Sequence, residues 1–138
     1  MVKSHYDLSN EQFERQFESR SLGASLFTHE AYLRLAYIHI SRYGLNQAEK
    51  NISYQIKNYV AKLGAEDKYN ETVTISAIKA VYHFMKRSDA EIFPEFIKLH
   101  PQLIYNFKGL LMSHYTTDIF NSQLAKQQFI EAELAPFN

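Results

Sequence analysis

The 138-residue sequence has no cysteine, no tryptophan, only four glycines and three prolines, and no excess of charge of either sign. Without cysteine the chain can form no disulfide, thiolate metal ligand or cysteine nucleophile. Its 15 basic and 15 acidic residues give a net charge of +0, so no overall field draws it to DNA, RNA or anionic lipid. We therefore expect no nucleic-acid partner, although Lys50, Lys57 and Lys62 supply local positive charge.

Long apolar runs are also missing. No stretch approaches the roughly 20 apolar residues that a membrane-spanning helix needs. The first seven residues lead into a charged segment, and the apolar core of a signal peptide does not follow. Together with the missing cysteine, these features favour a soluble, cytoplasmic protein that does not enter the membrane.

Apolar and aromatic residues are abundant, at 46% and 14% of the chain, with ten tyrosines and ten phenylalanines. This is enough apolar surface to build a substantial core, and the length predicts a single domain over residues 1–138. Strand signals are weak, because no Asn-Gly or Asp-Gly hairpin dipeptide occurs and period-two alternation is not sustained. The sequence therefore predicts an all-α fold.

Four longer helices are expected to form the core of a helical bundle. Ser9 and Gln12 have the spacing of a capping box, and the expected N-caps of the next three helices are Thr28, Asn46, and either Asn70 or Thr72. Because the connections are short, neighbouring helices should be antiparallel. The expected ranges are Ser9 to before Gly23, His29 to Arg42, Gln47 to Leu63, and Glu71 to Lys86.

Beyond residue 87 the apolar pattern becomes shorter and more interrupted. Short C-terminal helices are expected here, packed across the four-helix core. The expected elements are a turn capped by Ser88, a helix with Pro94 in its first turn, an apolar helix over residues 103–111, and a last helix from Asn121 or Ser122 to Phe129.

Polar side chains stand at two of the expected helix starts, whereas the common phosphate, nucleotide, hydrolase and metalloprotease motifs are absent. His29, in a first turn, is disfavoured as an imidazolium by the helix dipole, so it is either a neutral ligand or base, or simply a residue beside a cap. The helix dipole and the free amides of a first turn also explain Glu71. The functional alternative is a site in which Tyr69 and Thr74 are its hydrogen-bond partners and His29 lies across the bundle. Arg34 is expected to reach solvent along its apolar stem; the alternative is that it anchors an anionic ligand or Glu71.

The other histidines are less informative. We interpret His39 as a structural histidine that is satisfied or half-exposed, and His83 as a residue on the polar side of its helix. His5, His100 and His114 lie in poorly defined segments and receive no role.

Two segments resemble the motifs F-x-H-x-x-H and Y-H-E-T-[IV]-T of an uncharacterised bacterial all-α family. They are Phe27-Thr28-His29-Glu30-Ala31-Tyr32 and Tyr69-Asn70-Glu71-Thr72-Val73-Thr74. The resemblance covers most of the chain from Phe27 onward and implies a helical fold, but no activity. In the full pattern, three histidines and one glutamate would suit a metal or acid–base site. Tyr32 and Asn70 replace two of those histidines, so no metal is assigned and the cofactor is unknown.

These observations lead to two hypotheses about function. The first is a small-molecule-binding domain with a polar pocket at the starts of the second and fourth helices. The second is a non-catalytic structural or protein-interaction domain, in which His29, Tyr69 and Glu71 form only a helix-capping network. The sequence decides neither whether a reaction is catalysed nor whether the chain forms a homodimer, which its apolar second helix permits. The candidate ligand-binding residues are His29, Tyr32, Arg34, Tyr69, Asn70 and Glu71.

Overall fold

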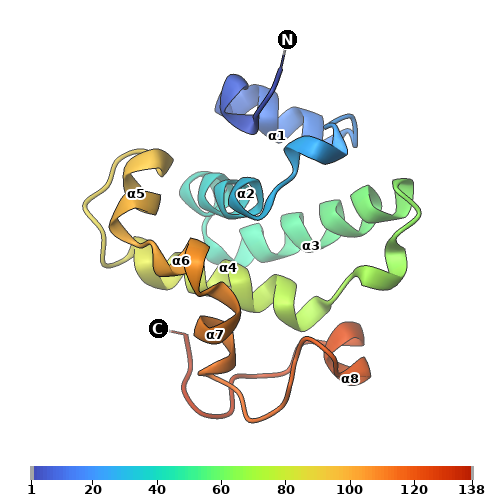
Figure 1. Cartoon of the computed structure of the whole chain (residues 1–138), viewed down its shortest axis with the longest axis vertical. Helices are drawn as coiled ribbons and strands as arrows, with labels where there is room; N and C mark the ends of the chain where they lie inside the picture. Colours follow the sequence, from blue (N-terminus) through green and yellow to red (C-terminus); the bar gives the residue numbers. More distant parts are fainter. Residues whose placement is uncertain (1, 138) are drawn as a thin grey trace. The chain divides into compact units, whose positions relative to one another are not determined.

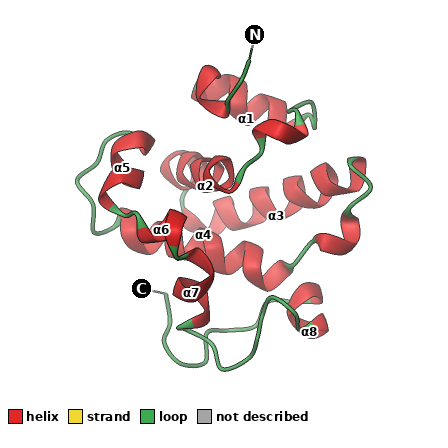
Figure 2. Ribbon diagram, viewed as in Figure 1, coloured by secondary structure: helices red, strands yellow, loops and turns green. Residues whose placement is uncertain are grey.

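All regular secondary structure in the described part of the chain, residues 2–137 of the computed structural model, is helical (Figures 1 and 2). The all-α prediction is confirmed. The chain forms two compact units, Met1–Tyr69 and Asn70–Asn138. The prediction that they make up one domain stays a prediction. None of the helices within residues 2–137 is long and apolar enough to cross a membrane.

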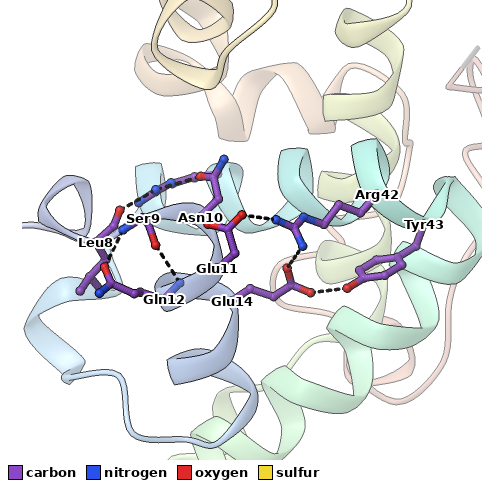
Figure 3. A network of polar contacts seen from close by, with 9 residues as sticks. Leu8, Ser9, Asn10, Glu11, Gln12, Glu14, Arg42 and Tyr43 are labelled. Carbon is purple, nitrogen blue, oxygen red and sulfur yellow. Dashed lines mark hydrogen bonds and ion pairs between the residues drawn. The ribbon is translucent and has the colours of Figure 1, made fainter.

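The first unit contains three α-helices and three short 3-10 helices. The predicted caps of two of them are confirmed: Ser9 and Gln12 bond each other's backbone N–H groups (Figure 3), and Thr28 Oγ1 accepts from Ala31 N at 3.1 Å. The elements are η1 (His5–Asp7), α1 (Asn10–Glu18), η2 (Ala24–Leu26), α2 (His29–Tyr43), α3 (Leu45–Lys62) and η3 (Glu66–Lys68).

The connection between α2 and α3 differs from the prediction. Asn46 does not cap α3, which begins at Leu45 directly after Gly44 and has no side-chain cap. Figure 1 shows α2 nearly end-on and α3 side-on, so the two helices cross steeply and are not antiparallel. A single linking residue cannot reverse the chain, because an antiparallel helix pair needs a loop of about two to five residues.

Aromatic side chains form much of the first unit's core. Phe13 and Phe17, one turn apart on α1, are fully buried, as their spacing predicts. The Phe17 ring lies 4.7 Å from that of Phe27 and 4.8 Å from that of Tyr59 on α3. The Tyr59 hydroxyl donates to the carbonyl of Leu22 at 2.9 Å, which satisfies its one polar atom. This cluster holds α1 and the segment before α2 against α3.

The second unit contains α4 (Glu71–Met85), α5 (Phe93–Leu99), α6 (Gln102–Tyr105), α7 (Phe107–Met112) and α8 (Gln123–Gln127). Pro94 lies in the first turn of α5, and Ser122 caps α8, as predicted. Ser88 Oγ accepts from Ala90 N in a local turn without a helix. The short helices α7 and α8 both contact α4.

The prediction of one helix over residues 103–111 is wrong, because Asn106 separates α6 from α7. Its backbone has φ −142° and ψ 38°, outside the helical range. Its side chain folds back over α7, where a Cβ added at Gly109 would lie 2.5 Å from Asn106 Oδ1. A short amide that occupies the space above Gly109 therefore competes with helix continuation.

Replacing Gly44 with alanine should destabilise the protein. Gly44 has φ 83° and ψ 166°, a region that is almost exclusive to glycine, so Gly44→Ala should lower the free energy of unfolding by about 1–3 kcal/mol in urea titrations. Gly23→Ala is the control, because Gly23 has φ −62° and its added Cβ would meet nothing closer than 4.0 Å. Equal stability of the two variants would contradict a strained link at Gly44.

Candidate functional site

The six predicted site residues divide between the two units. His29 is exposed at the first position of α2, and Tyr32 is half-buried with its ring 6.2 Å from that of Phe27, the spacing of a hydrophobic staple. Tyr69 is half-buried under Lys57, whose Nζ lies 5.2 Å from the ring centroid. Asn70 and Glu71 begin the second unit as the N-cap and first residue of α4. That these side chains line one pocket stays a prediction.

Arg34 does not reach solvent, so the favoured prediction for it is wrong. Its side chain is buried on α2, with the residue only 6% exposed. The guanidinium donates to the carbonyls of His5 (2.6 Å) and Leu8 (2.9 Å) and to Asn10 Oδ1 (2.9 Å). Its carbon also lies 4.8 Å from the centroid of the Phe13 ring. The N-terminal segment, residues 3–8, supplies the two carbonyls, and the first half of α1 supplies Asn10 and Phe13; together they cover the arginine.

The partners of Arg34 are all uncharged. Arg42 on the same helix pairs with Glu11 and Glu14, whereas Arg34 makes no ion pair within residues 2–137. Burial lowers the pKa of Arg34 from its ordinary value, but a guanidinium titrates so high that it stays charged at neutral pH. The arginine therefore places a positive charge beneath the surface with no carboxylate bonded to it.

The segment that covers Arg34 is ordered by its own capping box. Ser4 Oγ accepts from Tyr6 N at 3.1 Å, and Asp7 Oδ2 accepts from the backbone N–H groups of Lys3 (2.8 Å) and Ser4 (3.1 Å). These bonds hold η1 and direct the carbonyl of His5 toward Arg34. The Ser-x-x-Asp spacing is visible in the sequence, and it is the signal that could have revealed this element.

An open cavity of about 210 Å³ lies between this N-terminal segment, η2 and the start of α2. One of its walls is tied together by the Tyr6 hydroxyl, which donates to the Glu30 carboxylate. Thr28 and Glu30 line the cavity, whereas His29 does not. The complete lining is Lys3, Ser4, His5, Tyr6, Ser25, Leu26, Thr28 and Glu30.

His5 is the histidine that the sequence analysis missed. It is buried, 4% exposed, and its Nδ1 lies 3.2 Å from Nη1 of Arg34. Because a guanidinium can only donate, Nδ1 accepts, and the neutral ring carries its proton on Nε2. Burial lowers the pKa of His5, and the charge of Arg34 lowers it further against the opposing effect of Glu30. No hydrogen-bond acceptor for the Nε2–H group is found within residues 2–137, and His5 is one of the residues that line the cavity.

Tyr6 is kept in its neutral form. Burial, followed by its hydrogen bond to Glu30, raises the pKa of the Tyr6 hydroxyl well above its ordinary value. The hydroxyl therefore keeps its proton and donates it to the carboxylate. Glu30 has one oxygen engaged in this way, which holds the acidic side chain at the edge formed by Tyr6.

A second cavity in the first unit, about 320 Å³, lies over a network of charged residues between α1 and the end of α2. Arg42 contacts Glu11 at 2.9 Å and Glu14 at 3.5 Å, and the Tyr43 hydroxyl donates to Glu14 (Figure 3). Arg42 and Glu11 are exposed, whereas Glu14 is half-buried. The charges are largely paired with each other, and exposed pairs of this kind contribute little to stability.

His39 is buried on the same helix, only 1% exposed, and is neither satisfied nor half-exposed as predicted. The amide of Asn51 lies 3.4 Å from Nδ1, while Nε2 has no hydrogen-bond partner. Burial lowers the pKa of His39, with Glu14 opposing that change. His39 is therefore a neutral core histidine with one unsatisfied nitrogen.

In the second unit, the polar residues at the start of α4 hold the C-terminal segment. Asn70 accepts from Val73 N as the N-cap, and its Nδ2 donates to the carbonyl of Ile119 at 2.8 Å. Thr72 Oγ1 donates to the carbonyl of Gln128 at 2.9 Å and accepts from Ile130 N at 3.0 Å. Each of these side chains is engaged on both its donor and its acceptor side, so this part of the motif has a structural use.

His83 and His114, both in the second unit, line a cavity of only about 30 Å³, which has room for a water molecule. His114 Nδ1 bonds the carbonyl of Ala135 at 2.7 Å where the chain returns past α7 (Figure 1). In the described residues, no group of three or more His, Asp or Glu side chains could hold a metal ion. Two imidazoles are fewer than the ligands that zinc takes from a protein.

Replacing Arg34 with methionine should destabilise the protein strongly. The substitution keeps an unbranched stem but leaves the Leu8 carbonyl without its donor and the His5 carbonyl with only the Leu8 N–H, so Arg34→Met should cost about 3 kcal/mol of unfolding free energy. Arg42→Met, on the same helix but at an exposed ion pair, should cost much less. Urea titrations of both variants test this, and a small effect at Arg34 would show that its hydrogen bonds are replaceable.

The stability of the protein should fall as the pH drops below about 6.5. The folded-state pKa values of His39 and His5 lie below 6.5, so the unfolded chain binds protons more readily and acid favours unfolding. We expect a lower free energy of unfolding at pH 5.5 than at pH 7.5. His39→Phe keeps a buried ring but cannot be protonated, so its loss over this range should be smaller. An unchanged loss in His39→Phe would exclude His39 as a contributor.

Comparisons with known proteins assign no function to this chain. No family model matches the chain, and no curated protein and no solved structure matches it either. The resemblance of the two motifs to a bacterial helical family therefore stays a prediction. The features of the first unit that bear on function are the side chains around Arg34 and the cavity beside them.

Proposed function

We propose that the first unit is a small-molecule-binding module whose ligand occupies the cavity at the start of α2. The observation that carries the proposal is the His5 Nε2–H group. It is a donor on a nine-tenths-buried residue that Arg34 holds in one tautomer and that lines an open cavity. Small-molecule sites typically combine a concavity with a few polar groups fixed in this way. The proposal keeps the second-helix start suggested by the sequence, with His5 in place of His29.

Pre-organisation supports this assignment. Arg34 orients the His5 ring, Glu30 orients the Tyr6 hydroxyl, and Ala31 N orients the Thr28 hydroxyl oxygen. Their side-chain entropy is already lost before a ligand arrives, so less of the interaction energy is spent on ordering the site. A helical unit that fixes three cavity-lining groups without a ligand is suited to reversible binding.

A second candidate function, a structural or interaction role without chemistry, is favoured by one observation in the second unit. Asn70 and Thr72 spend their hydrogen-bonding capacity on the segment 119–130. In this reading, the second unit displays a surface and binds no small ligand. A cytoplasmic location, a bacterial origin and a homodimer are further proposals, which rest on the cysteine-free sequence, the two motifs and the apolar second helix.

A ligand screen on the full chain tests the binding proposal. At least one small compound should raise the melting temperature and shift backbone amide NMR signals of residues 3–6 and 25–31. A ligand at about 100 times its Kd adds roughly 2.7 kcal/mol of stability. Ser25→Leu should fill the cavity and abolish the shift, whereas Ser41→Leu, exposed on α2 away from the cavity, should not. Hits that bind Ser25→Leu as well as the unmodified protein would refute this location.

A further inference from the structure

We infer that the cavity beside α2 recognises an oxyanion, the carboxylate or phosphate group of a small acidic molecule. This inference rests on the proposed binding function and specifies its ligand. The first observation that supports it is the set of hydrogen-bonding groups on the cavity lining. The groups that can donate are the Lys3 ammonium, the His5 Nε2–H and the hydroxyl hydrogens of Ser4, Ser25 and Thr28. The one carboxylate on the lining is Glu30, and Tyr6 already donates to it.

Two of these hydroxyls are set up to donate. Ser4 Oγ already accepts from Tyr6 N at 3.1 Å, and Thr28 Oγ1 accepts from Ala31 N at 3.1 Å. With their oxygens engaged by backbone N–H groups, their remaining capacity includes the O–H donor. An ionised carboxylate only accepts, and the ionised oxygens of a phosphate group accept as well, so both match such donors. The carboxylate that an ammonium ligand would need is supplied only by Glu30, and Tyr6 already donates to one of its oxygens.

The charges around the cavity also favour an anion. Lys3 and the buried Arg34 place two cations at this end of the first unit, and Glu30 is the one acid on the lining. The second nearby acid, Asp7, is turned toward the backbone N–H groups of Lys3 and Ser4. The His5 ring is influenced more by the positive charge of Arg34 than by the negative charge of Glu30.

The start of α2 adds to this potential. The helix runs over 15 residues from His29 to Tyr43, and its N-terminal end carries a partial positive charge that favours anions. Thr28, the N-cap, lines the cavity, so the positive end faces the same space as the His5 donor. At about 210 Å³, the cavity is smaller than the roughly 300 Å³ at which drug-sized sites begin, and one acidic group with a short substituent suits it.

NMR titration of the full chain with inorganic phosphate, acetate and methylammonium, at pH 7.5 and fixed ionic strength, tests the ligand class. We expect saturable amide shifts in residues 3–6 and 25–31 with phosphate or acetate, and none with methylammonium. Phosphate alone would identify a phosphate site, and acetate alone a carboxylate site. Both results support an oxyanion.

Three charge variants sharpen the test. Lys3→Glu should weaken the anion about tenfold or more, because it exchanges an attractive for a repulsive charge. Glu30→Gln keeps an acceptor for Tyr6 but removes the only lining acid, so it should tighten the anion about fivefold. Lys50→Glu, an exposed lysine on α3 that does not line the cavity, is the charge-matched control and should change nothing.

The possible failures are distinguishable. Saturable binding of methylammonium that Glu30→Gln abolishes would overturn the oxyanion inference but leave the binding proposal intact. If Lys3→Glu and Lys50→Glu weaken anion binding equally, only the overall charge of the protein matters. That result would also overturn the oxyanion inference. If none of the three ions binds and the wider ligand screen finds nothing in the cavity, both the inference and the proposed function fall.

Discussion

The burial of one charged side chain, Arg34, is the constraint on which the N-terminal half of the first unit depends. Moving a guanidinium out of water is costly unless its donors are satisfied. The carbonyls of His5 and Leu8 and the amide of Asn10 satisfy them, so the residues before α1 must adopt one conformation. The same arrangement buries His5, fixes its proton on Nε2 and forms one wall of the cavity. Arg34 thus both stabilises this part of the fold and helps to shape the candidate site.

Much of the fold could be predicted because the deciding interactions are local. Ser9 and Gln12, Thr28 and Ala31, and Asn70 and Val73 are each three residues apart, so their identities and spacing suffice to place a helix start. The prediction failed where a longer-range fit overrode the local pattern. Asn106 folds over Gly109 and divides an apolar stripe that periodicity alone reads as continuous. At Gly44, only the backbone geometry shows how sharply the chain turns.

The candidate site was harder to predict than the fold, for a physical reason. Arg34 bonds atoms 24 to 29 residues away in the sequence, and two of them are backbone carbonyls, which every residue possesses. The hydrogen bonds to these carbonyls therefore cannot be predicted from the identity of the residues. His29 attracted interest because it stands at a helix start, yet it is its neighbours Thr28 and Glu30 that face the cavity. For the second motif, Asn70 and Thr72 could be read as polar, but not as holders of a distant segment.

The hydrogen bonds that Asn70 and Thr72 make in the second unit span 49 to 58 residues. Closing a chain segment of that length costs conformational entropy before any contact compensates for it, which slows folding. During synthesis, α4 emerges long before the residues that complete its first turn. Until residues 119–130 have been added, the Thr72 hydroxyl has water in place of its final partners. The second unit therefore reaches its native contacts late, and a chain interrupted before residue 119 cannot form them at all.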